Sequence, residues 1–91
     1  MHTAVVLLEA ERDALGDLGG RLAEVDGVAE AWSVAGEWDF VAIVRVPRAE
    51  QLRDVIAGRL VQLQGVARTQ TMVAFEVFSR HDLEAMFDIG S

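Results

Sequence analysis

The chain lacks cysteine and is poor in proline and in positive charge, with one proline and 8 basic against 15 acidic residues. Without cysteine, disulfides, thiolate metal sites, thiol nucleophiles and thiol redox switches are excluded. The formal net charge of −7 repels the phosphates of nucleic acids, and no basic patch with interleaved aromatic residues is present. We therefore expect no direct binding to DNA or RNA.

Long hydrophobic runs are also missing. The apolar run near the N-terminus covers residues 4–8 and ends at Glu9, and no positively charged segment precedes it. Such a run is too short for the core of a signal peptide or for a membrane span. We expect a cytoplasmic protein with no membrane association.

Recognisable catalytic and metal-binding motifs are absent as well. His2 and His81 lie far apart and have no acidic or histidine partner at ligand spacing, so both are expected to be solvated. Ser33 and Ser79 have no histidine at a motif spacing, although a triad is assembled in space. The glycine-rich residues 16–20 lack the lysine and threonine of a phosphate loop, and close helix-to-sheet packing explains them better. We predict no catalytic residue, no metal site and no cofactor.

The residues that are present favour one compact domain that associates with further copies. At 91 residues, of which 52% are hydrophobic, the chain supports one core and buries about 60 to 65% of its unfolded surface. A core of this size cannot hide so many apolar side chains, so another subunit is expected to cover part of them. The sequence predicts a homo-oligomer.

Apolar periodicity predicts six elements within one domain and a short helical tail. Strands are expected over residues 4–8, 28–35, 39–46 and 66–78, and helices over residues 13–25 and 52–63. The segment Ser79-Arg80-His81-Asp82 resembles a capping box that opens a C-terminal helix. We expect a ligand-binding and oligomerisation domain over residues 1–80. The tail, residues 81–91, is too acidic for a membrane surface, and we expect it to dock on its own or a neighbouring subunit.

An internal repeat with an offset of 38 residues organises these elements. Gly20-Arg21-Leu22 matches Gly58-Arg59-Leu60, and Gly27-Val28-Ala29 matches Gly65-Val66-Ala67. The order is therefore βαβ twice. This predicts an α+β, ferredoxin-like βαββαβ fold, with a four-stranded antiparallel sheet and two helices on one face, plus the short C-terminal helix.

The inner strands are apolar on both faces, although two helices can cover only one. Residues 4–8 and 40–44 are apolar throughout. A monomer would leave one of these faces in water. We therefore predict a dimer in which sheet packs against sheet, burying on the order of 1,600 Å² in total.

The segment between the second and third strands combines a glycine, two carboxylates and an indole. Ordinary turn chemistry explains part of it, since Gly36 can supply a positive φ and Asp39 can accept hydrogen bonds from turn amides. The same composition also suits a small-molecule site. The candidate residues here are Ala35, Gly36, Glu37, Trp38 and Asp39.

Four short motifs, in this order, resemble the ligand-binding domain of the Lrp/AsnC family, also called the RAM (regulation of amino acid metabolism) domain. They are Val25-Asp26-Gly27-Val28, Gly36-Glu37-Trp38-Asp39-Phe40, Leu63-Gln64-Gly65-Val66 and Thr69-Gln70-Thr71-Met72-Val73. The resemblance covers about residues 3 to 79. It implies sheet-packed dimers, usually assembled into tetramers of dimers, with small effectors, often amino acids, bound between dimers.

The resemblance also implies which residues bind the effector. The family's hairpin glycine and aspartate match Gly36 and Asp39, and its threonines on the last strand match Thr69 and Thr71. A carboxylate can pair with the α-ammonium of an amino acid, while backbone amides and threonine hydroxyls can bind its α-carboxylate. The alternative for the threonines is the β-propensity of a half-buried strand. Trp38 is expected to form a subunit contact or a pocket wall.

Two departures from the family pattern are visible. The first strand begins almost at Met1, so we expect no helix-turn-helix domain, and the chain alone is not expected to read an operator. Ala35 stands where family members often have threonine, which removes one ligand donor. We expect a non-enzymatic module that senses an amino acid or related metabolite, with a full-length Lrp/AsnC-type regulator as a possible partner. The alternatives are a ferredoxin-like dimeric monooxygenase-type enzyme and a purely structural assembly module.

Overall fold

The structure is a computed structural model, and it describes residues 1–80. The predicted C-terminal helix and the tail 81–91 lie outside the described residues. The elements are β1 (His2–Ala10), a 3-10 turn η1 (Arg12–Ala14), α1 (Leu18–Ala23), β2 (Val28–Ser33), β3 (Phe40–Val46), α2 (Ala49–Val55), a π-helical turn η2 (Ile56–Leu60) and β4 (Val66–Val73).

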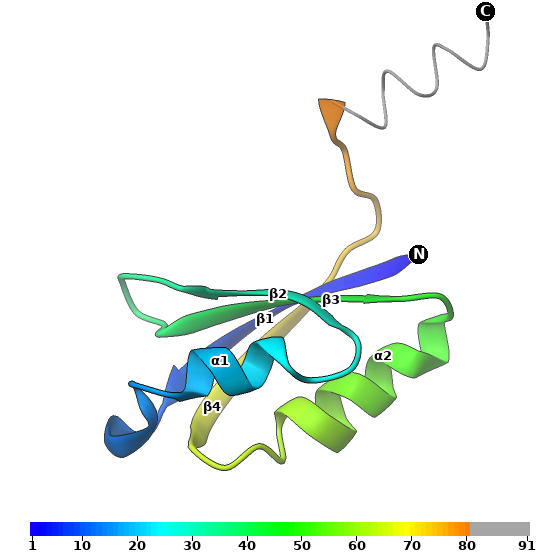
Figure 1. Cartoon of the computed structure of the whole chain (residues 1–91). Helices are drawn as coiled ribbons and strands as arrows, with labels where there is room; N and C mark the ends of the chain where they lie inside the picture. The colour runs from blue at the N-terminus through cyan, green and yellow to red at the C-terminus, as the bar shows by residue number, and fades with distance from the viewer. Residues whose placement is uncertain (81–91) are drawn as a thin grey trace, which may run out of the picture.

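The four strands form one antiparallel sheet in the order β2-β3-β1-β4. The two central strands, β1 and β3, contain the fully apolar segments of the sequence. Both helices lie on the same side of this sheet (Figure 1). The predicted α+β ferredoxin-like βαββαβ fold is confirmed.

One face of the sheet forms the core against the helices. Ala4, Val6 and Leu8 of β1 are completely buried, and the pairing of Ala4 with Val44 places alternate residues of β3 on the same side. Leucines of the helical segments complete this layer, namely Leu18, Leu22, Leu52 and Leu60. Within residues 1–80 no polar or charged side chain is buried. The space between sheet and helices is therefore a hydrophobic core.

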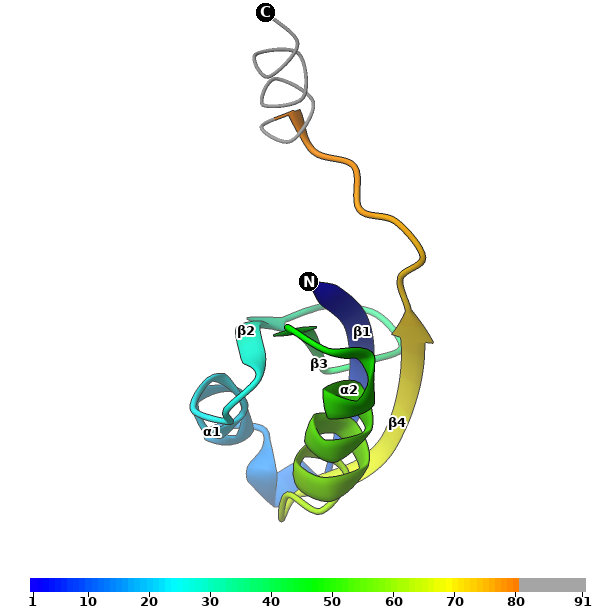
Figure 2. The same ribbon diagram turned by 90° about the vertical axis from the view of Figure 1, so that its right-hand side faces the viewer.

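The opposite face of the sheet, here called the open face, is also apolar along its centre. Val41 and Ile43 are only 8% and 7% exposed, because strand neighbours flank them on the same side. Trp32 pairs with Val41, and Met72 pairs with Val5, and the side chains of Trp32 and Met72 are nearly half exposed. No helix within residues 1–80 covers this face (Figure 2). The expected apolar character of both faces is confirmed.

The internal repeat has a structural counterpart in two turns. Gly27 and Gly65, 38 positions apart, have φ angles of +97° and +99°, and each directly precedes a strand. A β-carbon at Gly27 would overlap the Val55 side chain, and one at Gly65 would lie 2.5 Å from the β-carbon of Ala14. Both positions therefore require glycine twice over, for the backbone angle and for the close approach of a helical segment.

The prediction of one continuous helix over residues 13–25 is wrong. The structure divides it into η1 and the six-residue α1, and Leu15 is exposed. Glycines weaken helices in the middle of the segment. Gly19 has a packing reason, because a β-carbon there would lie 2.9 Å from the ring of Phe40. The expectation that close helix-to-sheet packing explains these glycines is confirmed at this position.

The last strand is shorter than predicted, ending at Val73 rather than residue 78. Its partner strand β1 begins at His2, and the amide of Ala74 donates the last bond, of 2.9 Å, to the carbonyl of Thr3. Beyond this bond, β1 forms no further backbone hydrogen bond with the described residues that follow β4. Residues 74–80, here called the arm, continue away from the sheet and from both helices (Figures 1 and 2).

Candidate functional site

The connection between β2 and β3, residues 34–39, is fastened to the neighbouring strand β1. The amide of Asp39 donates to the carbonyl of Leu8 at 3.0 Å, and the amide of Val34 donates to the carbonyl of Asp39 at 3.0 Å. The carboxylate of Asp39 accepts a bond of 2.9 Å from the amide of Ala10 through Oδ2. Asp39 therefore fixes the base of the loop through one carboxylate oxygen, and within residues 1–80 the other oxygen accepts no hydrogen bond.

The tip of this loop is accessible. Ala35, Gly36 and Glu37 are exposed, whereas Trp38 and Asp39 are half-buried. Gly36 has a φ of +123°, an angle that side-chain-bearing residues rarely adopt. A β-carbon at Gly36 would meet nothing within 4 Å. The glycine is thus required by the backbone angle alone, and the space beside it is free.

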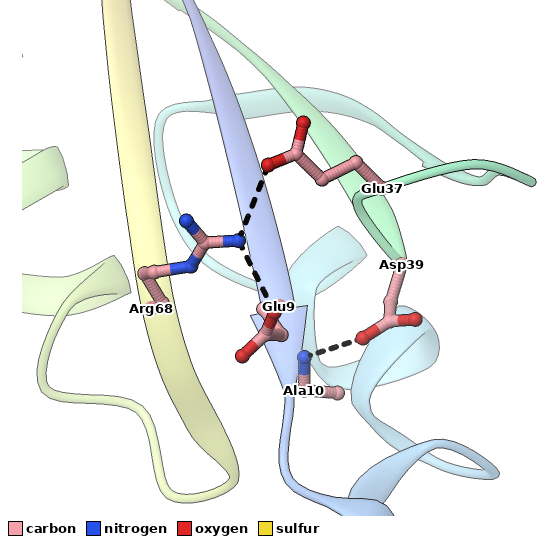
Figure 3. Close-up of polar contacts among 5 residues, drawn as sticks. All are labelled: Glu9, Ala10, Glu37, Asp39 and Arg68. Carbon is pink, nitrogen blue, oxygen red and sulfur yellow. Dashed lines mark hydrogen bonds and ion pairs between the residues drawn. The ribbon is translucent and has the colours of Figure 1, made fainter.

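A charged cluster joins the loop to the far edge of the sheet (Figure 3). Nη2 of Arg68, on β4, lies 3.2 Å from Oε2 of Glu9 and 3.7 Å from Oε1 of Glu37. Its guanidinium carbon lies 4.3 Å from the centroid of the Trp38 ring. Cation–π contact and two carboxylates hold this side chain in place. Three segments, from β1, β4 and the loop, meet at one arginine.

Arg68, Glu9 and Ala10 were not among the residues predicted from the sequence. Glu9 and Arg68 are cross-strand neighbours in the β1–β4 pair, and the register shifts directly after Glu9. Opposite charges on paired strands are a known stabilising arrangement. This pair can be identified only when the register between β1 and β4 is known. The register shift after Glu9 prevents that register from being inferred from the sequence.

The two predicted threonines lie on the other side of β4. Thr69 is paired with Leu8 and Thr71 with Val6, so both point to the side of the sheet that carries the helices. Thr69 is half-buried and Thr71 is exposed. Arg68 points to the open face with Glu9. Within one protomer the structure brings the loop residues together, but Thr69 and Thr71 are separated from the Arg68 cluster by the sheet.

Residues 1–80 contain neither a metal-binding cluster nor a membrane-spanning helix. No group of three or more His, Asp or Glu side chains in that range is arranged to hold a metal ion. In the same range, no helix is both long enough and apolar enough to cross a membrane.

Comparison with known proteins places this fold in a family. The model of the Lrp/AsnC ligand binding domain matches residues 3–83. An uncharacterized HTH-type transcriptional regulator of Pyrococcus furiosus is 36% identical over 76 residues, which cover 80% of this chain and 51% of the relative. The chain thus spans about half the length of the curated relatives it matches.

Solved structures agree with this assignment. The protein TTHA0845 of Thermus thermophilus is 41% identical, with a TM-score of 0.80, over 88% of this chain and 100% of that one. A feast or famine regulatory protein from M. tuberculosis, solved in complex with L-methionine, is 28% identical, with a TM-score of 0.67, over 87% of this chain and 53% of that one.

Domains of this family generally oligomerise and bind effectors, and the family is not enzymatic. The prediction of a non-enzymatic domain is therefore confirmed, and the monooxygenase-type alternative is set aside. The matched region includes all four sequence motifs and the loop of residues 34–39. The chain belongs to the family of Lrp/AsnC ligand-binding (RAM) domains.

Proposed function

We propose that this domain binds an amino acid or a related small metabolite between subunits of a homo-oligomer, using the loop of residues 35–39. The observation that carries the proposal is the anchoring of that loop. Asp39 holds it to Ala10 through one oxygen while the other stays available to a ligand, and the glycine-only angle at Gly36 leaves the backbone beside it accessible. A preorganised loop of this kind loses little entropy when a ligand binds.

The chemistry suits a zwitterion. The ligand's ammonium group would pair with the carboxylates of Asp39 or Glu37, and its carboxylate would accept bonds from backbone amides near Gly36 and from threonine hydroxyls. Ala35 lines the tip without a donor, and Trp38 forms a wall. Because Thr69 and Thr71 lie on the helix side of β4, the proposal assigns the loop and the threonines around one ligand to different protomers.

Assembly is the second part of the proposal. The open face carries a contiguous apolar strip centred on Val41 and Ile43, which supports a sheet-packed dimer. Association of such dimers into a tetramer of dimers would bring loops and threonines of different dimers together. We further propose a cytoplasmic location and co-assembly with a full-length regulator of the same family through the same face.

The test is a thermal-shift and calorimetric screen of the purified chain against the standard amino acids, beginning with L-methionine because a 28%-identical structure contains it. A ligand at 100 times its Kd stabilises the folded state by about 2.7 kcal/mol. We expect one or a few amino acids to raise the Tm selectively.

The variant Asp39→Asn tests whether ligand binding depends on the negative charge of Asp39. An amide oxygen still accepts the bond from Ala10, so the loop keeps its anchor while the negative charge is lost. We expect the Kd for the ligand to rise at least 10-fold with little change in the Tm of the free protein. The matched control is Asp54→Asn on α2, an exposed aspartate remote from the loop, which should leave the Kd unchanged. Equal Kd values for wild type and Asp39→Asn would remove Asp39 from the site.

A purely structural assembly module is the second candidate. It is favoured by the internal pairing of the cluster, since Arg68 is already held by Glu9, Glu37 and Trp38. The absence of any Tm shift at millimolar amino acid, together with an intact oligomer, would select this candidate over effector binding.

A further inference from the structure

We propose that Arg68 is a specificity-determining residue of the loop site, and that it recognises the α-carboxylate of the bound amino acid. The inference rests on the proposed function and adds a selectivity to it, for molecules with a free carboxylate over the corresponding amides. Asp39 would pair with the ammonium group at one end of the ligand, and Arg68 would bind the carboxylate at the other.

The charges around the loop are the first observation. Three carboxylates gather there, those of Glu9, Glu37 and Asp39 (Figure 3). Such surroundings attract an ammonium group and repel a carboxylate. The chain has no lysine, and Arg68 is the arginine that contacts both Glu37 and Trp38 of the loop. Arg68 therefore supplies the positive charge that the carboxylate end of a zwitterion requires.

The unused donors of Arg68 are the second observation. A guanidinium carries five N–H donors, but the contacts with Glu9, at 3.2 Å, and with Glu37, at 3.7 Å, are both made by Nη2. The other two nitrogens lie on the opposite side of the guanidinium from these contacts (Figure 3). Within residues 1–80, neither Nη1 nor Nε has a hydrogen-bond or ion-pair partner. The side chain, 50% exposed, therefore keeps donors for a further carboxylate.

The fixed position of Arg68 is the third observation. Its guanidinium carbon lies 4.3 Å from the centroid of the Trp38 ring, and Nη2 donates a hydrogen bond to Glu9 on the neighbouring strand. Exposed ion pairs of this kind contribute little to stability. A cation that is already held in place, however, loses little side-chain entropy when a ligand binds. The arrangement is therefore better suited to binding than to stabilising the fold.

Two other arginines show what a structural arginine does in this fold. Nη1 of Arg21 donates to the carbonyl of Gln64 at 2.8 Å, and Nη1 of Arg59 donates to the carbonyl of Asp26 at 2.7 Å. Arg21 and Arg59 are 38 positions apart, the offset of the internal repeat, so each braces a turn that belongs to the other half. Within residues 1–80, Arg68 braces no backbone carbonyl in this way.

The test compares molecules that differ at one end. Calorimetry with L-methionine and L-methioninamide, at about pH 6 so that both α-amino groups are charged, gives the preference for a carboxylate as the ratio of the two Kd values. If another standard amino acid gives a larger Tm shift, that amino acid and its amide are used. We expect Arg68→Gln to lower this ratio at least 10-fold, because a hydrogen bond between charged groups is lost.

The variant Asp39→Asn provides the reciprocal measurement. The preference for an ammonium group is the ratio of Kd values for L-methionine and for its analogue in which hydrogen replaces the amino group. We expect Asp39→Asn to lose this preference and to keep the preference for a carboxylate, and Arg68→Gln to do the opposite. If Arg68 only held the loop in place, its removal would weaken binding of all three molecules alike and leave both ratios unchanged.

Arg45→Gln is the matched control. Arg45 is also an exposed arginine of the sheet, 42% against 50% for Arg68, and it forms an ion pair of 3.5 Å with Glu30 near the end of β3 that is remote from the loop. It should leave both ratios unchanged, and sedimentation checks that all variants keep the wild-type assembly. An unchanged carboxylate preference in Arg68→Gln would overturn the role of Arg68 alone. Failure of wild type to bind any standard amino acid would overturn the proposed function as well.

Discussion

At the scale of single residues, the sequence suggested two roles for Asp39 and could not separate them. Turn chemistry and ligand binding were both expected of this carboxylate, and the structure shows a bond to the amide of Ala10, 29 positions away. That partner lies on another strand rather than in the turn itself. A contact of this span depends on the tertiary fold, so composition and local spacing indicate the residue but not its partner.

Removal of the Asp39 side chain should therefore destabilise the fold even without ligand. Asp39→Ala leaves the half-buried amide of Ala10 without an acceptor, and a hydrogen bond to a charged group contributes about 1.5 to 3 kcal/mol. We expect the free energy of unfolding in urea to fall by about 1 to 2 kcal/mol, while Asp54→Ala changes it by less than about 0.5 kcal/mol. Equal stability of Asp39→Ala and wild type would show that the bond to Ala10 is dispensable.

At the scale of elements, the strands were more predictable than the first helix and the last strand's end. β3 was located to within one residue, because an apolar strand, buried except at Arg45, between a turn and Pro47 has a distinct pattern. The leucines of the segment 13–25 are spaced as in a helix, but the structure divides the segment. It also packs closely against two neighbours, with Phe40 beside Gly19 and Gly65 beside Ala14. The end of β4 depends on where β1 begins, which no local pattern contains.

The glycines at turns offer a matched comparison of backbone strain with steric overlap. Gly36→Ala imposes only the unfavourable φ, and we expect a loss of about 1 to 2 kcal/mol. Gly27→Ala imposes a similar φ and also drives a methyl group into Val55, so the loss should reach about 3 kcal/mol or more. Urea unfolding at one fixed protomer concentration gives both values. Equal losses at the two positions would mean that Val55 moves aside without cost.

At the scale of the whole molecule, the protomer consists of two layers, the sheet and the helices. A monomeric domain of this fold could be stable with a polar open face. The composition already indicated more apolar side chains than one core can bury. In the structure the additional apolar side chains lie on the open face and the arm. The candidate site is divided in the same way. Its loop residues are assembled within one protomer, whereas Thr69 and Thr71 belong to the opposite side of the sheet, so the sequence could name these residues but not the protomers that would combine them.

The open face can be tested with two substitutions of the same kind at residues of equal exposure. Met72, on the open face, is 46% exposed, and Val61, beside the helical turn η2, is 45% exposed. Met72→Lys would place a charge in each half of a sheet-packed interface, where an unpaired buried charge is strongly unfavourable. We expect its dimer Kd to rise at least 100-fold by sedimentation, while Val61→Lys leaves the Kd within about 3-fold of wild type. A larger loss of association for Val61→Lys than for Met72→Lys would place the dimer contact on the helical side and reject the sheet-packed arrangement.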